Sequence, residues 1–156
     1  MKKITILLLI TLSLSGCKTP SVTSRKLDRK PQIAIKGSWT LSAISYPGQD
    51  YIKVNAFDLA ETNCFLGSNW NFISNNNKGN LSLNSGSCTS YTSPITWFVN
   101  KDGEFVMKIL NDYKARRVRE GYVLRVANQT ESAFELIDKV NVGGKIIDIT
   151  YQFQRN

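Results

Sequence analysis

The sequence predicts an all-β protein that forms an eight-stranded antiparallel up-and-down barrel. Apolar and polar residues alternate over most of the chain from Gly37 onward, and turn-forming residues recur every eight to fifteen positions or so. A sustained helical period is absent from this part of the sequence. The chain has 156 residues, of which 42% are hydrophobic, as expected for a single compact domain. Consecutive hairpins form a meander that can close into a barrel. A flat sandwich is the competing fold.

Each strand is predicted by apolar residues that recur at every second position. In chain order these are Trp39, Leu41 and Ala43; Trp70 and Phe72; Leu81 and Leu83; Ile95, Trp97 and Val99; Phe105, Met107 and Ile109; Tyr122, Leu124 and Val126; Phe134 and Leu136; and Ile147, Ile149, Tyr151 and Phe153. The predicted turns, at 75–79, 100–103, 128–130 and 141–144, are rich in residues that favour turns. The stretch compatible with a short helical turn is Ala56–Asn63. Closure of the barrel requires the last strand to pair with the first.

The first seventeen residues have the layout of a secretory signal. Two lysines precede an apolar run of about eleven residues, Ile4–Leu14, which is too short to span a membrane. The following Leu14-Ser15-Gly16-Cys17 resembles the lipobox of bacterial lipoproteins. This resemblance implies that residues 1–16 are removed and that Cys17 carries a diacylglycerol and an N-linked acyl chain such as palmitate, which together give stable membrane anchoring. An ordinary signal peptide that ends near a cysteine is the alternative.

Residues 17–36 are predicted to form a flexible, lipid-anchored basic tether, because they contain two prolines and no apolar periodicity. The net charge of +8 is concentrated in the first part of the chain: residues 18–36 hold six basic residues and one acidic, whereas residues 37–156 hold twelve and eleven. The folded part is therefore nearly neutral, and we expect no nucleic-acid partner. The tether either lies against anionic lipid head groups or is a solvated linker.

The cysteines and the absence of histidine limit the kinds of catalytic and metal-binding site that the chain can form. Cys64 and Cys88 remain once Cys17 is acylated, and outside the cytosol they are expected to form a disulfide. A reactive or metal-binding pair is the alternative, although the two cysteines lack Cys-x-x-Cys spacing. Because the chain has no histidine, histidine-containing catalytic triads and His-ligated metal sites are excluded. We expect no metal, no cofactor and no catalytic residues.

Residues 37–156 resemble a lipocalin barrel, in particular the lipocalin-like lipoproteins of Gram-negative bacteria. The opening Gly37-Ser38-Trp39 resembles the Gly-x-Trp signature of lipocalins, and further similar segments are Ser45–Gly48, Asn63–Trp70, Phe72–Asn77, Ile95–Phe98, Gly121–Leu124 and Tyr151–Arg155. The resemblance implies that Gly37 and Trp39 are structural, with the Trp39 indole closing one end of the barrel. It also implies that a late arginine packs on Trp39 by a cation–π contact, with Arg155 as the candidate and Arg125 as the alternative.

The inward positions of such a barrel are the candidate ligand-binding residues. They are Trp70, Phe72, Trp97, Phe105, Met107, Tyr122, Leu124 and Tyr151. Eight-stranded barrels either fill with side chains or hold one small ligand, so a filled core is the alternative. A ligand for these residues would be apolar or flat, with one polar group. The basic cluster at 114–119 fits a solvated edge, with a phosphate- or polymer-binding patch as the alternative.

These features lead to one functional expectation and one alternative. We expect a monomeric, non-catalytic, lipid-anchored protein of the cell envelope that binds or carries a small hydrophobic molecule. The alternative is a scaffold with a filled barrel that binds an envelope protein or polymer. Since Lys18 follows Cys17 and no acidic residue occurs before Asp28, we expect the periplasmic face of the outer membrane, with the cell surface as the alternative.

Overall fold

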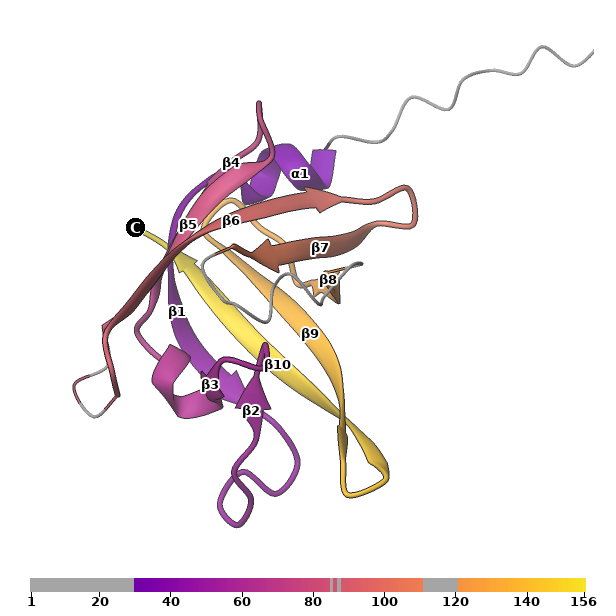
Figure 1. The fold of residues 1–156 in the computed structure, drawn as a ribbon. Helices are drawn as coiled ribbons and strands as arrows, with labels where there is room; N and C mark the ends of the chain where they lie inside the picture. The colour runs from indigo at the N-terminus through magenta and orange to yellow at the C-terminus, as the bar shows by residue number, and fades with distance from the viewer. Residues whose placement is uncertain (1–29, 85, 87, 111–120) are drawn as a thin grey trace, which may run out of the picture.

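The computed structural model describes residues 30–84, 86, 88–110 and 121–156 (Figure 1). The predicted signal peptide, Cys17, residues 18–29 and the basic cluster at 114–119 lie outside the described residues. The elements are α1 (Lys30–Ile35), β1 (Gly37–Ser45), β2 (Asn55–Ala56), β3 (Ala60–Glu61), the 3-10 helix η1 (Thr62–Phe65), β4 (Asn69–Ile73), β5 (Lys78–Leu83), β6 (Tyr91–Val99), β7 (Glu104–Ile109), β8 (Tyr122–Ala127), β9 (Ala133–Val142) and β10 (Lys145–Arg155).

Eight of the strands close into an antiparallel barrel in the order β1-β10-β9-β8-β7-β6-β5-β4. Strand β1 completes the circle, because Trp39 lies opposite Arg155 of β10 on one side and opposite Trp70 of β4 on the other. The predicted barrel and the pairing of the first strand with the last are thus confirmed, and the sandwich is wrong. Closure leaves none of these eight strands as a free edge.

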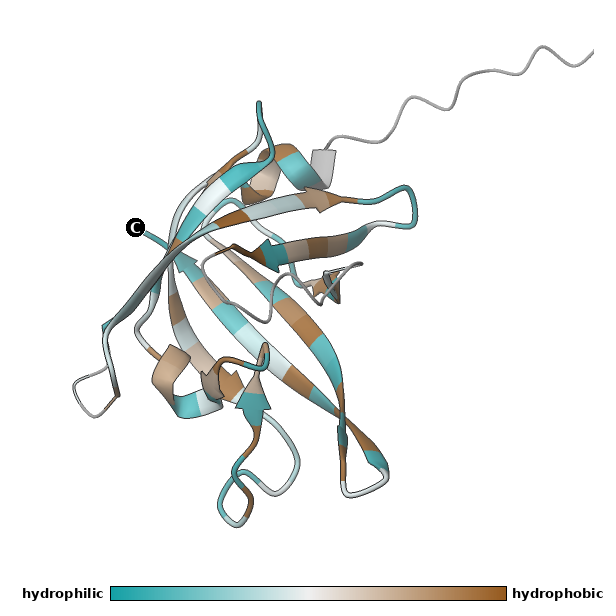
Figure 2. Cartoon of the chain, viewed as in Figure 1, coloured by the Kyte–Doolittle hydropathy of each residue, from teal (hydrophilic) through white to brown (hydrophobic). Residues whose placement is uncertain are grey.

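The alternation in the sequence places one set of side chains inside the barrel. In β10, Ile147, Ile149, Tyr151 and Phe153 are buried, whereas Asp148 and Gln152 between them are exposed. Figure 2 shows the same alternation of hydrophobic and hydrophilic residues along β9 and β10. Because side chains of a strand point alternately to its two faces, the sequence pattern alone selects the core.

The strand directions give the barrel two different ends. Helix α1 and the turns at 74–77, 100–103 and 128–132 gather at one end, which we call the closed end. The β9–β10 turn and the segment 46–61, which carries β2 and β3, lie at the opposite end (Figure 1). We call this second end the mouth and residues 46–61 the lid segment.

Helix α1 corrects the predicted boundary of the tether. Residues 30–36 belong to the fold, since Ile35 is buried and its carbonyl accepts a 2.7 Å hydrogen bond from the Trp39 indole. Arg155 donates to the carbonyls of Ala34 and Lys36. A six-residue helix is unstable alone, so these tertiary contacts hold it, which explains why no periodicity revealed it. Within the described part of the chain, the helices are too short to span a membrane.

The lid segment corrects a second expectation. The helical turn expected over Ala56–Asn63 is wrong for most of that range, which forms the short hairpin of β2 and β3. Helical geometry begins at Thr62, in η1. The sequence did not predict this hairpin, because its turn contains neither glycine nor asparagine, the residues by which hairpin turns are usually recognised.

The predicted disulfide is confirmed. Cys64 and Cys88 are bonded, with their Cα atoms 5.7 Å apart, and they are separated by 24 positions in the sequence. The bond joins η1 to the connection between β5 and β6 at the mouth.

Loss of this disulfide should destabilise the barrel. Because it closes a loop of this length, the Cys64→Ser/Cys88→Ser variant is expected to lose about 3 kcal/mol of unfolding free energy by the chain-entropy estimate. Urea denaturation with and without dithiothreitol measures the effect, and reductant should leave the double variant unchanged. Identical curves for the oxidised and reduced parent protein would contradict the prediction.

Candidate functional site

The closed end is built around Trp39, whose side chain is fully buried. The guanidinium carbon of Arg155 lies 4.2 Å from the centre of the Trp39 ring, so Arg155 is the arginine that packs on the indole. Arg125 is exposed, on β8. Gly37 has φ +127°, and a Cβ atom there would lie 2.6 Å from a guanidinium nitrogen of Arg155, which explains the glycine of the signature. These contacts make the closed end a structural plug.

All of the predicted ligand-binding residues face the interior, and they pack against one another. Trp70, Phe72, Trp97, Phe105, Met107, Leu124 and Tyr151 are buried, and Tyr122 is partly buried. The rings of Trp97 and Phe105 are stacked at 5.7 Å, and those of Phe134 and Phe153 at 4.7 Å. Deep in the barrel, the described side chains thus form a close-packed aromatic core.

At the mouth, the plug is supplied by the lid segment. Phe57 is 5% exposed and its ring reaches into the barrel. It is stacked on Tyr151 at 5.3 Å and meets Tyr122 at 5.2 Å, Phe65 at 5.4 Å and Trp70 at 6.2 Å edge to face. We call Phe65, Trp70, Tyr122 and Tyr151 the aromatic cage. Phe57 fills it.

The tip of the lid hairpin is strained. Phe57 and Asp58 have φ of 53° and 50°, and the Leu59 amide donates to the Ala56 carbonyl, as in the primed turns of hairpins. Glycine or asparagine normally occupies such positions, and a bulky residue with positive φ is a genuine outlier. The Tyr122 hydroxyl donates to the Phe57 carbonyl and holds the tip in place. Strain of this kind clusters at ligand clamps and switch regions.

The comparisons with known proteins agree with this architecture. A family model described as a lipocalin-like domain matches residues 35–136. The chain belongs to the lipocalin-like domain family. Lobster apocrustacyanin A1 is a similar solved structure, with 13% identity, a TM-score of 0.53, and coverage of 87% of this chain and 70% of that one. A complex of bovine odorant-binding protein with a selenium-containing odorant has 13% identity, a TM-score of 0.45, and coverage of 79% and 71%. The likeness to apocrustacyanin A1, at 13% identity, shows the fold alone. A search of curated proteins gave no match.

Among the described residues, the lipocalin-like barrel also buries two tyrosine hydroxyls that have no hydrogen-bond partner there, those of Tyr91 and Tyr151. A buried polar group left unsatisfied costs about 1–3 kcal/mol. Burial raises the pKa of Tyr151 above its usual range, and the charge of Asp138 raises it further. The Tyr151 hydroxyl therefore stays protonated and can donate a hydrogen bond.

Asp138 places a carboxyl group on an otherwise apolar face. It continues the inward alternation of Phe134 and Leu136 along β9, and its register partner on β10 is the fully buried Ile149. Burial raises the pKa of Asp138, and the charge of Asp58 in the lid tip raises it further, while a hydrogen bond from the Lys139 backbone lowers it. The mouth thus combines apolar rings with one carboxyl group.

The raised pKa of Asp138 predicts a pH-dependent cost to stability. The folded protein holds this proton more tightly than the unfolded chain, so stability falls as pH rises from the unfolded pKa of 3.8 through the raised folded pKa. Asp138→Asn should therefore be more stable than the parent at pH 7, with the difference vanishing below about pH 4. Urea denaturation at both pH values measures it. Asp148→Asn, on the outer face of β10, should not show this change, and a less stable Asp138→Asn at pH 7 would refute the prediction.

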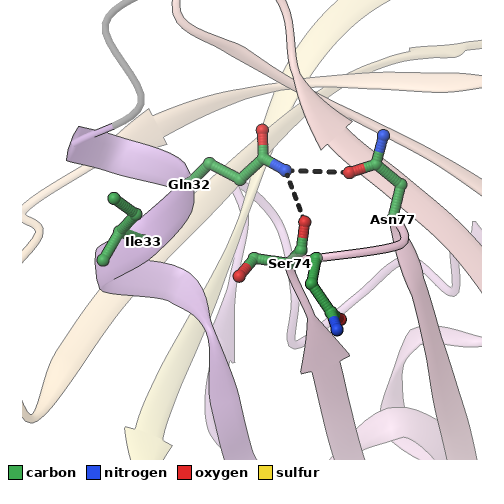
Figure 3. A pocket seen from close by; sticks show the side chains of 5 residues that line it. Gln32, Ile33, Ser74 and Asn77 are labelled. Carbon is green, nitrogen blue, oxygen red and sulfur yellow. Dashed lines mark hydrogen bonds between the residues drawn. The ribbon is translucent and has the colours of Figure 1, made fainter.

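Several hollows lie outside the packed interior of the described barrel. One, of about 690 Å³, lies beside the lid segment and is lined by residues that include Leu59, Cys64, Cys88 and Tyr91. Another, of about 440 Å³, lies at the closed end between α1 and the 74–77 turn (Figure 3). There the Gln32 amide donates to the Asn77 side chain at 2.9 Å, so the protein itself uses this polar group. The described residues contain no cluster of acidic or cysteine side chains that could hold a metal ion.

Sequence reasoning missed three residues of the mouth, Phe57, Phe65 and Asp138. Phe57 lies in the lid segment, where no alternation marks a side chain as inward. For Asp138 a signal existed, because Phe134, Leu136, Asp138 and Val140 share one face of a strand. A single acidic residue within an apolar alternation is a mark of a polar group in the interior.

Proposed function

We propose that this lipocalin-like protein is a lipid-anchored protein of the cell envelope that binds a small hydrophobic molecule in the mouth of its barrel, without catalysing a reaction. The observation that carries the proposal is the position of Phe57. Its ring occupies an aromatic cage inside the barrel, yet it is carried by a short hairpin at the end of the molecule and not by a barrel strand.

The lid segment has the properties of a replaceable plug. Its hairpin consists of two residue pairs, Asn55 with Glu61 and Ala56 with Ala60. Its ion pair, from Lys53 to Glu61 at 3.3 Å, is exposed, and such pairs contribute little stability. Withdrawal of the tip would release the strain at Phe57 and leave an apolar space bounded by the aromatic cage. A hydrophobic molecule in that space would replace the contacts that the Phe57 ring gives up.

Binding of a neutral hydrophobic probe tests this function. The fluorescence of N-phenyl-1-naphthylamine should rise on addition to the full chain, and Phe57→Ala should bind the probe at least about tenfold tighter, since it no longer competes for the cage. Phe98→Ala removes a phenyl ring from the outer surface of the barrel and should leave the affinity unchanged. Absence of binding to both the parent and the Phe57→Ala protein would refute the proposal.

The anchor is supported by the lipobox-like sequence that ends at Cys17. In a Gram-negative host, the full chain should be found in the outer-membrane fraction, and mass spectrometry of its N-terminal peptide should show an acylated Cys17. Cys17→Ser should release the protein from membranes, because the acyl chains that hold it would be missing. Membrane retention of that variant would contradict the anchor, and protease treatment of whole cells distinguishes the periplasmic face from the cell surface.

A scaffold function is the second candidate, and an outer surface favours it. Phe98, Val106 and Val123 are register neighbours across β6, β7 and β8. Phe98 and Val123 are 43% and 46% exposed, whereas Val106 between them is 6% exposed. An apolar row of this kind on the outside of a sheet suits a protein partner. Crosslinking in intact cells should then capture one partner, and Phe98→Asp should abolish its capture. An unchanged pattern would exclude this surface.

A further inference from the structure

The mouth carries polar groups whose arrangement indicates a class of ligand. Asp138 and Tyr151 lie on the inward faces of β9 and β10, which are neighbours in the barrel. Tyr151 is opposite Leu136, and the next inward pair towards the mouth is Ile149 with Asp138. The carboxyl group is therefore a diagonal neighbour of the tyrosine, one pair closer to the mouth.

The Tyr151 hydroxyl is the polar group of this arrangement that lacks a hydrogen-bond partner among the described residues. The side chain is 1% exposed, and its oxygen has no hydrogen-bond partner in the described structure. Nearby hydroxyls are engaged: that of Tyr46 donates to the Ile52 carbonyl at 3.0 Å, and that of Tyr122 donates to the Phe57 carbonyl. A ligand in the cage could give the Tyr151 oxygen the partner that it lacks.

The aromatic cage favours a particular kind of occupant. Ring faces carry negative electrostatic potential, so the rings of the cage favour a ligand whose polar end is a cation over one whose polar end is an anion. Asp138 adds a carboxyl group beside this cage, and Asp58 brings a second acidic side chain on the lid tip close enough to interact with it. A carboxylate ligand such as a fatty acid would meet repulsion from both, whereas an ammonium group would be attracted.

We propose that the Asp138 carboxylate, the Tyr151 hydroxyl and the aromatic cage form a binding site for hydrophobic amines, in which the ammonium group pairs with Asp138 and the apolar body replaces the Phe57 ring. This inference rests on the proposed function and specifies its ligand class. With the lid segment in place, as the structure shows it, the Phe57 ring is stacked on Tyr151 and occupies the position that the apolar group of the ligand would take. The lid segment is then a built-in competitor that a ligand must displace.

Three phenyl compounds that differ in charge test this inference. 2-Phenylethylamine, 2-phenylethanol and phenylacetate carry the same ring with a cationic, a neutral and an anionic group. Their affinities for the full-chain Phe57→Ala protein are measured at pH 7.5 by calorimetry, after near-ultraviolet circular dichroism has shown that the variant is folded. If Phe57→Ala does not fold, Phe57→Leu, which leaves a smaller vacancy, takes its place.

The expected order is amine, then alcohol, then carboxylate, with the amine bound at least about tenfold more tightly than the alcohol, since hydrogen bonds to charged groups are the stronger ones. Adding Asp138→Asn should remove this preference, because the asparagine amide carries no charge to pair with the ammonium group. Adding Asp148→Asn instead should keep the preference, because Asp148 is exposed on the outer face of β10 and lies opposite Lys139.

The remaining outcomes separate the two proposals. Equal affinities for amine and alcohol, or a preference that survives Asp138→Asn, would overturn the amine site while leaving a hydrophobic binding protein. Failure of the cage variant to bind any of the three compounds, together with no binding of N-phenyl-1-naphthylamine, would overturn both.

Discussion

Replacement of Trp39 by alanine is expected to lower the free energy of unfolding by about 3–5 kcal/mol, the range for a large aromatic residue removed from a core. The substitution removes the ring edge against Phe134, whose centre is 4.7 Å away, the indole hydrogen bond to the Ile35 carbonyl, and the surface on which Arg155 packs. Urea denaturation measures the loss. Hydrogen exchange should also accelerate over 30–36, because α1 depends on these contacts.

Two milder variants separate the contributions. Trp39→Phe keeps most of the apolar packing but lacks the N–H donor, so it should be intermediate in stability. Arg155→Lys keeps the charge and loses the planar group, together with its hydrogen bonds to the carbonyls of Ala34 and Glu131, and should cost less than Trp39→Ala. A Trp39→Ala protein as stable as the parent would show that the closed end does not depend on the plug.

Phe72→Ala is the second substitution with a large expected effect, again about 3–5 kcal/mol. The Phe72 ring lies 5.2 Å from that of Trp97 and 5.5 Å from that of Phe105, and rings of Trp70, Phe134 and Phe153 complete its surroundings. These large rings come from different strands and cannot close the vacancy without moving the sheet, so the cavity should persist.

Phe98→Ala is the matched control for this experiment. It removes the same side chain from the outer face of β6, where Phe98 is 43% exposed, and should change stability by less than about 1 kcal/mol. Both variants are compared by urea denaturation at one pH. If Phe72→Ala were no more costly than Phe98→Ala, the centre of the barrel would not be the close-packed core described above.

The period-two alternation explains why so much of the barrel was predictable. Trp97 shares one face of its strand with the residues at every second position, so burial of that face turns all of them inward. Closure of the barrel does not change which face is inward. The same rule could not place Phe57, since the lid segment has no period. Applied to the two arginines, it favours Arg155, which continues the inward series that ends at Phe153, over Arg125, which lies between the inward Leu124 and Val126. Helix α1 escaped prediction for a related reason, because contacts distant in sequence hold it.

The sequence predicted which side chains face the interior of the barrel, but it did not predict the polar groups at the mouth. Tyr151 was expected to face inward and does, but its missing hydrogen-bond partner is a property of the folded interior. The sequence alone shows Asp138 as a polar residue in an apolar series. Its place beside Tyr151 follows from the strand register, which the sequence does not show.

Both ends of the described domain lie at the closed end of the barrel, and this bears on how the molecule is oriented. The amide of Asn156 donates to the carbonyl of Ser38, and Lys30 begins α1 at the same end, so both ends of the described domain lie opposite the lid. A chain tied to a bilayer through residues before Lys30 would be held by its base. Under the proposed anchoring, the mouth would lie at the end of the domain farthest from the point of attachment, so a hydrophobic ligand would enter on the side away from the anchor.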